Sequence, residues 1–227
     1  MVPQDKLDVL KSGLLQQLKT RFGITPGDLS SQVYNPEVGR IINDFSVQRL
    51  RKMLETSGGS TLVGGLSVLD ETQRYLSPTI ILNPDKDSQM MTEEIFGPIL
   101  IVMTYAHFDE VVNQIRNSGK PLAVYYAGNP SSSNFKRLTY ETSSGNITAN
   151  DVLHHTMDFE NGFGGVGMSG YGRVGGYEAF KMWSNPKSVV KKWQLNIWPA
   201  NDIAPPYTNS KKKLMRTLLG LTNLKQN

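Results

Sequence analysis

Two short groups of polar residues have side chains that could take part in chemistry. His154 and His155 could ligate a metal, and Glu93 and Glu94 could act as an acid and a base. Neighbouring residues of a strand point to opposite faces, so two adjacent histidines rarely share one ion. His107 has no helical or strand spacing to them. We interpret the histidines as a structural or surface pair, and the two glutamates, on spacing alone, as a solvated turn or strand entry.

A glycine-rich motif at residues 165–170 fits the pattern G-x-G-x-x-G of dinucleotide-binding loops. That function requires a strand before the motif and a helix beginning within it, because the helix N-terminus holds the pyrophosphate. The preceding segment, residues 158–162, is not strand-like, and residues 171–176 are a poor start for a helix. The sequence therefore favours a shaped loop over a phosphate-binding site.

The sequence contains no cysteine among its 227 residues. This excludes disulfides, thiolate zinc sites and a cysteine nucleophile within the chain. Neither a serine nucleophile elbow nor a Walker loop is present. The residues alone thus predict a folded domain with a glycine-rich loop, but not a reaction.

The net charge of +4 is a property of the C-terminal tail. The tail has five basic residues and no acidic residue, so the body is close to neutral, which argues against a nucleic-acid partner. Leucines at helical spacing follow the basic cluster, which suits either an anionic membrane surface or a frayed, solvated end. The residues expected at a membrane surface are Lys211, Lys212, Lys213 and Arg216.

The hydrophobic pattern alternates between helical and strand-like periods. Continuous apolar strands separated by helices predict an α/β fold, with a mostly parallel sheet covered by helices on both faces. Asn43 or Asp44 is expected to cap the second helix, whose inward residues are Val47, Leu50, Met53 and Leu54. Expected helices cover residues 7–18, 44–57, 108–115, 133–142 and 177–183, and expected strands cover 61–63, 75–82, 98–105, 122–126, 145–148 and 188–198.

Four blocks of sequence, in order and at consistent spacing, resemble the aldehyde dehydrogenase superfamily. They are Glu93-Glu94-Ile95-Phe96-Gly97-Pro98 and the segments 121–125, 145–152 and 163–172. Segments 40–44, 75–79, 166–167 and 204–207 look most like the fatty (long-chain) aldehyde dehydrogenase branch. The resemblance covers nearly the whole chain, from about Val2 to Tyr207.

The resemblance implies oxidation of aldehydes to carboxylic acids with NAD or NADP. Carried over residue by residue, it implies that Glu94 hydrogen-bonds the nicotinamide ribose, since a carboxylate accepts from two hydroxyls at once. It implies that Phe96 lies beside the nicotinamide and that Phe163 lines the aldehyde tunnel, where core packing is an alternative role.

The resemblance also implies that the catalytic groups are absent from this chain. In the family the nucleophilic Cys, the general-base Glu and the oxyanion Asn all precede the segment that this chain resembles. We therefore expect a C-terminal half-enzyme, inactive and marginally stable by itself, with no catalytic residue of its own. Expected divisions are a partial catalytic domain at 1–187, an oligomerisation strand segment at 188–207 and a basic tail at 208–227.

Three functions stay open at this point. The chain is part of an NAD(P)-dependent fatty aldehyde dehydrogenase, or a non-catalytic partner of a full-length paralogue, or a peripheral protein of a membrane surface. A homo-oligomer such as a dimer, or a full-length paralogue, is the expected protein partner. No apolar run is long enough to cross a membrane and residues 1–11 lack the pattern of a signal peptide. These features predict a cytoplasmic location, with association to an intracellular membrane face as the alternative.

Overall fold

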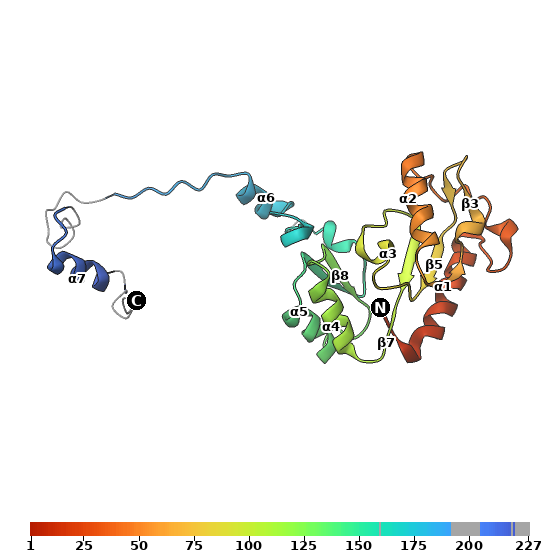
Figure 1. The fold of residues 1–227 in the computed structure, drawn as a ribbon, viewed down its shortest axis with the longest axis horizontal. Coiled ribbons are helices and arrows are strands. Elements are labelled where there is room, and N and C mark those ends of the chain that lie inside the picture. The colour runs from red at the N-terminus through yellow and green to blue at the C-terminus, as the bar shows by residue number, and fades with distance from the viewer. Residues whose placement is uncertain (159, 192–204, 219, 221–227) are drawn as a thin grey trace. The chain divides into compact units, whose positions relative to one another are not determined.

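The computed structural model describes residues 1–158, 160–191, 205–218 and 220. The chain divides into two units, Met1–Ser184 and Asn185–Asn227, and Figure 1 shows their elements. The first unit contains the sheets and most of the helices, and the second contains one described helix, α7 (Asn209–Leu218). The candidate site residues all lie in the first unit.

Two long helices begin and end where their sequences indicate. Gly23 ends α1 (Leu7–Phe22) in a left-handed conformation, with φ of 68°, which glycine adopts without steric cost. Asn43 caps α2 (Asp44–Glu55), and its side-chain oxygen accepts a hydrogen bond of 2.8 Å from the Ser46 N–H. The four apolar residues predicted to face inward from α2 are all buried, which confirms that prediction.

The central sheet has the order β2-β5-β6. Parallel pairing joins β5 (Thr79–Leu82) to β6 (Ile99–Val102), and antiparallel pairing joins β2 (Ser60–Val63) to β5. The strand predicted over residues 75–82 is interrupted, because Ser77 and Pro78 separate β5 from β4 (Tyr75–Leu76), which pairs with β3 (Leu69–Asp70). Proline has no N–H to donate, so a ladder does not continue through Pro78.

Helices cover both faces of this sheet, as the pattern predicts. Ile81 points into a core with Leu50 and Met53 of α2, whereas its neighbour Ile80 points into a core with Ile24. The leucines of α1 pack against that second core. Successive side chains of β5 thus point to opposite faces of the sheet, one covered by α1 and the other by α2.

A second group of elements follows the central sheet along the chain. Residues 98–105 divide at Met103, after which β7 (Thr104–Tyr105) pairs in parallel with β1 (Val2–Pro3). Then come α4 (Phe108–Asn117), β8 (Ala123–Tyr126), α5 (Ser133–Glu141) and β9 (Asn146–Ala149), of which β8 and β9 pair in parallel. Three of the strand pairings are parallel and two antiparallel, so the α/β, mostly parallel fold is confirmed.

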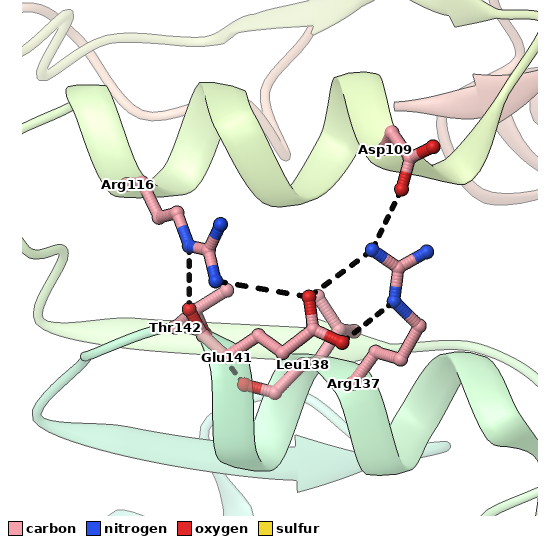
Figure 2. A network of polar contacts seen from close by, with 6 residues as sticks. All are labelled: Asp109, Arg116, Arg137, Leu138, Glu141 and Thr142. Atoms are coloured by element: carbon pink, nitrogen blue, oxygen red, sulfur yellow. Dashed lines mark hydrogen bonds and ion pairs between the residues drawn. The ribbon is translucent and has the colours of Figure 1, made fainter.

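An ion-pair network joins α4 to α5, as Figure 2 shows. Arg137 Nε lies 2.8 Å from Glu141 Oε1, and Arg137 Nη2 lies 2.7 Å from Asp109 Oδ1. Arg116 Nε donates to the Glu141 carbonyl oxygen at 2.7 Å. The hydrogen bonds from Arg137, ahead of the charges of Arg137 and Arg116, lower the pKa of Glu141 from its ordinary value. The network thus links the side chains of α4 to those of α5.

In the described residues after β9, the α-helices are α6 (Gly176–Met182) and α7. The short helix α6 follows the glycine-rich loop, close to the predicted place. Residues 188–191 of the predicted oligomerisation strand are not in a strand, and residues 192–198 lie outside the described residues. Within the part of the chain that the structure describes, no helix is long and apolar enough to cross a membrane.

Candidate cofactor-facing site

The turn that carries Glu94 and Phe96 connects α3 (Gln89–Thr92) to β6. It is hydrogen-bonded to a side chain of α2. Arg49 of α2 is half-buried and donates two hydrogen bonds to the turn, one to the Glu94 carbonyl at 2.9 Å and one to the Ile95 carbonyl at 2.6 Å. A guanidinium has a rigid fork of donors, so two adjacent carbonyls fix both its position and its orientation. The backbone of this turn is therefore tied to a helix whose own packing is buried.

The next two residues of the turn, Phe96 and Gly97, differ in their surroundings. A Cβ on Gly97 would lie 2.7 Å from Leu50 Cδ1, so a larger residue here would force the buried Leu50 side chain of α2 to shift. Phe96 has a φ of 44°, in the left-handed region that non-glycine residues rarely adopt. The residue Phe96 is 78% exposed, and Glu94 is exposed as well. The turn thus presents a carboxylate and an aromatic ring to the outside of the unit.

This arrangement suits recognition of a sugar and a flat ring. The Glu94 carboxylate is free to accept from two neighbouring hydroxyls, and Phe96 offers an apolar face beside it. Glu93 has a different role, because its carboxylate accepts a hydrogen bond of 2.9 Å from the Gln89 side chain. The structure places Glu94 and Phe96 in one turn, and their roles toward a cofactor stay predictions.

Arg49 is the residue that sequence reasoning missed. Its partners lie 45 and 46 residues further along the chain, so no local spacing reveals the contact. The available signal was that Arg49 and Arg51 flank the buried Leu50 on a predicted helix, and such a pattern is also typical of a solvated helix face.

Phe163 belongs to a different group of residues from Glu94 and Phe96. Its backbone forms two hydrogen bonds of 2.8 Å with Val174 in an isolated antiparallel bridge. Its ring centroid lies 5.4 Å from that of His155, which lies 5.6 Å from that of Tyr125. Phe163 is half-buried, so packing accounts for part of its surface and a role toward substrate stays a prediction.

The glycine-rich loop packs its own backbone tightly. A Cβ on Gly165 would lie 2.1 Å from the Ser169 carbonyl oxygen, and Arg173 donates to the carbonyls of Gly145 and Gly164 at 2.7 and 2.6 Å. The motif contains a short 3-10 turn at Gly167–Ser169 and does not begin a helix after a strand. Its glycines are therefore explained by close backbone packing, as the sequence indicates, and not by a phosphate.

The two adjacent histidines lie in different environments. His154 is exposed, with Nδ1 3.5 Å from a carboxylate oxygen of Asp151, whereas His155 packs between the rings of Tyr125 and Phe163. Among the residues that the structure describes, no group of three or more His, Cys, Asp and Glu side chains could hold a metal ion.

Comparison with known proteins identifies the class to which this fold and turn belong. The sequence matches the aldehyde dehydrogenase family over residues 9–189. The chain belongs to the aldehyde dehydrogenase family, as the motif blocks predict.

Particular relatives are moderately similar in sequence, and the match covers between 32% and 65% of their own length. A probable coniferyl aldehyde dehydrogenase of Pseudomonas aeruginosa is 38% identical over 81% of this chain, which spans 38% of that protein. The dimeric, NADP-preferring aldehyde dehydrogenase of Bos taurus is 39% identical over 70% of this chain and 65% of its own length. Aldehyde dehydrogenase family 3 member A2 of Mus musculus is 40% identical over 70% of this chain and 32% of its own length.

A solved structure of Staphylococcus aureus AldH in a substrate-bound state matches the fold with a TM-score of 0.72 and 32% identity. The match covers 96% of this chain but 45% of AldH, so more than half of AldH has no counterpart here. The fold of the present chain is thus that of one part of an aldehyde dehydrogenase.

Proposed function

We propose that this chain supplies the nicotinamide-facing wall of an NAD(P)-dependent aldehyde dehydrogenase that oxidises fatty aldehydes to carboxylic acids. The observation that supports the proposal is the turn held by Arg49, which presents Glu94 and Phe96 together at the surface. Membership of the aldehyde dehydrogenase family supports the reaction class. The similarity of segments 40–44 and 75–79 to the fatty aldehyde branch supports the substrate class.

Each residue of the proposed site has a separate task. Glu94 accepts hydrogen bonds from the two hydroxyls of the nicotinamide ribose, and the Phe96 ring restricts where the nicotinamide lies. Phe163 contributes an apolar surface to the path of the aldehyde. Bound NAD or NADP would supply the hydride acceptor of the reaction. The nucleophile, the general base and the oxyanion donor are not supplied by these residues, and the sequence contains no cysteine.

The proposal predicts binding without turnover for the chain alone. Nicotinamide mononucleotide, used as the probe, should shift the backbone amide resonances of Glu94 and Phe96 in NMR spectra. Glu94→Gln should weaken this binding several-fold, because a neutral amide is a poorer acceptor than a carboxylate. Glu93→Gln is the matched control and should bind as the unchanged chain does. Aldehyde and NAD together should give no NADH above a boiled sample.

Two outcomes would overturn this proposal. Resonances of the turn that do not respond to the probe would remove the cofactor-facing role. NADH formation above the boiled control would show that the chain catalyses the reaction without a thiol.

A second candidate function is binding to an anionic membrane surface through α7. One side of this helix carries exposed Lys212, Lys213 and Arg216, and the other carries half-buried Leu214 and Met215. An amphipathic helix with a basic face is typical of segments that lie on anionic lipid. This function concerns the second unit only and is compatible with the first.

A further inference from the structure

The sequence contains a single Asn-Gly pair, Asn161-Gly162, which immediately precedes Phe163. A peptide nitrogen can attack the side-chain carbonyl carbon of the asparagine before it and release ammonia. Glycine favours this step, because it has no Cβ to hinder the approach of its nitrogen and it adopts backbone conformations that other residues avoid. Asn161 is therefore the asparagine of this chain with the least hindered neighbouring nitrogen.

Both reacting groups are accessible in the structure. Among the described residues, the Gly162 N–H donates no hydrogen bond, so its nitrogen is not engaged elsewhere. Asn161 is exposed, and its Nδ2 donates a hydrogen bond to Asp158 Oδ2. This hydrogen bond is the main cause that lowers the pKa of Asp158 from its ordinary value. Asp158 is thus a carboxylate at neutral pH and restrains the amide that would react.

The surroundings of Gly162 leave no room for a longer backbone. A Cβ on Gly162 would lie 2.9 Å from both Cβ and Cγ of Glu178 in α6. The next residue, Phe163, is hydrogen-bonded to Val174 through both its N–H and its carbonyl, each at 2.8 Å. A change of backbone length at Asn161 must therefore displace either the contact with Glu178 or the bridge of Phe163.

We propose that Asn161 is a site of spontaneous covalent modification and that Asp158 restrains the reaction. The Gly162 nitrogen bonds to Asn161 Cγ, the bond between Cγ and Nδ2 breaks, and ammonia leaves with the proton of the Gly162 N–H. Water then opens the cyclic imide at either of its carbonyls, which yields aspartate or isoaspartate. Water is the co-reactant, and nothing is oxidised or reduced.

Both products loosen the segment that carries Phe163. Each replaces the amide donor of Asn161 by a carboxylate, which repels the carboxylate of Asp158. Isoaspartate also adds one methylene to the backbone, directly before the crowded Gly162. The modification goes beyond the proposed function, and its effect on the aldehyde path through Phe163 is the part that rests on that function.

The test incubates the full 227-residue chain at mildly alkaline pH and maps its peptides by mass spectrometry over time. Asn161 should react at least about tenfold faster than Asn117, which is also exposed but precedes Ser118. Isoaspartyl methyltransferase with labelled S-adenosylmethionine distinguishes isoaspartate from aspartate, which have equal mass. Asp158→Ala removes the restraint and should raise the rate at Asn161 several-fold, without a change at Asn117.

Two controls separate the effect of the structure from that of the local sequence. In denaturing guanidinium chloride, the unchanged chain and Asp158→Ala should react at equal rates, because the hydrogen bond is absent from both. Asn161→Asp introduces the charge without the additional methylene, so it should disturb Phe163 less than isoaspartate does.

The consequence for Phe163 is measured on modified chain, which ion exchange separates by its additional negative charge. Hydrogen exchange of the Phe163 and Val174 amides should be at least about tenfold faster than in the unmodified chain. Nicotinamide mononucleotide should shift the resonances of the turn at Glu94 equally in both forms, since that turn lies in a different part of the sequence.

Three results would overturn the inference. They are reaction at Asn161 no faster than at Asn117, equal rates in the folded unchanged chain and folded Asp158→Ala, and exchange at Phe163 that modification leaves unaltered. A Glu94 turn that ignores nicotinamide mononucleotide in both forms would instead contradict the proposed function, and the rates at Asn161 would still decide the inference.

Discussion

The smallest unit of the candidate site is a pair of adjacent backbone carbonyls that accept hydrogen bonds from one arginine. Arg49 orients the carbonyls of Glu94 and Ile95, and the two residues that follow are fixed by a left-handed backbone and by close contact with Leu50. Strained backbone persists only where its surroundings determine it. The conformation of Phe96 therefore depends on α2 and not on the turn alone.

At the residue scale we predict that Arg49→Ala destabilises the protein by about 1–3 kcal/mol, because two carbonyls lose their donors. Chymotrypsin should also cleave after Phe96 faster in this variant. The matched control is Arg51→Ala on the same helix, which breaks exposed ion pairs to Glu55 and Glu71. Exposed ion pairs contribute little to the free energy of unfolding. This control should therefore shift the midpoint of urea unfolding less and leave the rate of cleavage after Phe96 unchanged. Equal behaviour of the two variants would contradict the prediction.

At the element scale, local signals predicted most of the fold. The cap at Asn43, the end of α1 at Gly23 and the buried positions of α2 follow from the residues themselves. The break at Pro78 was missed, because apolar side chains continue on both sides of it. The motif blocks placed Glu94 and Phe96, but the contact of Arg49 with their turn could not be predicted, since it joins residues far apart in sequence. The sequence also could not predict that β8 pairs with β9 alone among the described residues, because strand pairing depends on the assembled sheet.

The network between α4 and α5 predicts a pH-dependent contribution to stability. Hydrogen bonds from Arg137 lower the pKa of Glu141 below its ordinary value of 4.5. A carboxyl with a lowered pKa in the folded state stabilises the protein above its unfolded pKa, and this contribution is lost as the pH falls through the folded pKa. Glu141→Gln should thus lower Tm at pH 7, and the difference from the unchanged chain should shrink as the pH falls below about 4. Melting curves between pH 7 and pH 3 check this, and a constant difference would contradict it.

At the scale of the whole molecule, the sheets and the excess of positive charge belong to different units of the chain. The first unit contains the sheets and the candidate site, whereas the excess of positive charge belongs to the tail in the second unit. Within the described residues, β8 of the first unit pairs only with β9, and the second unit contains the basic helix α7.

The tail therefore predicts lipid binding that is independent of the candidate site. Each basic residue near an anionic surface contributes roughly 1 kcal/mol, so reversing three charges should weaken binding to phosphatidylserine vesicles more than a hundredfold. The variant carries Glu at Lys212, Lys213 and Arg216, and deletion of residues 208–227 should have the same effect.

A control for this prediction makes the same change in net charge outside the tail. It carries Glu at Lys6, Lys19 and Lys136 and should bind vesicles nearly as the unchanged chain does. Sedimentation with the vesicles at low and at physiological salt measures both. Binding that survives loss of the tail would exclude α7 as the lipid-binding element.

The left-handed Phe96 has a consequence for how a ligand would be bound. Since Arg49 and Gly97 hold the turn before any ligand arrives, its conformational entropy is lost during folding and not during association. A ligand that meets this turn would find its competent conformation already populated, so the observed dissociation constant would approach the intrinsic one. Loosening the turn would then raise the dissociation constant while the residues that touch the ligand stay unchanged.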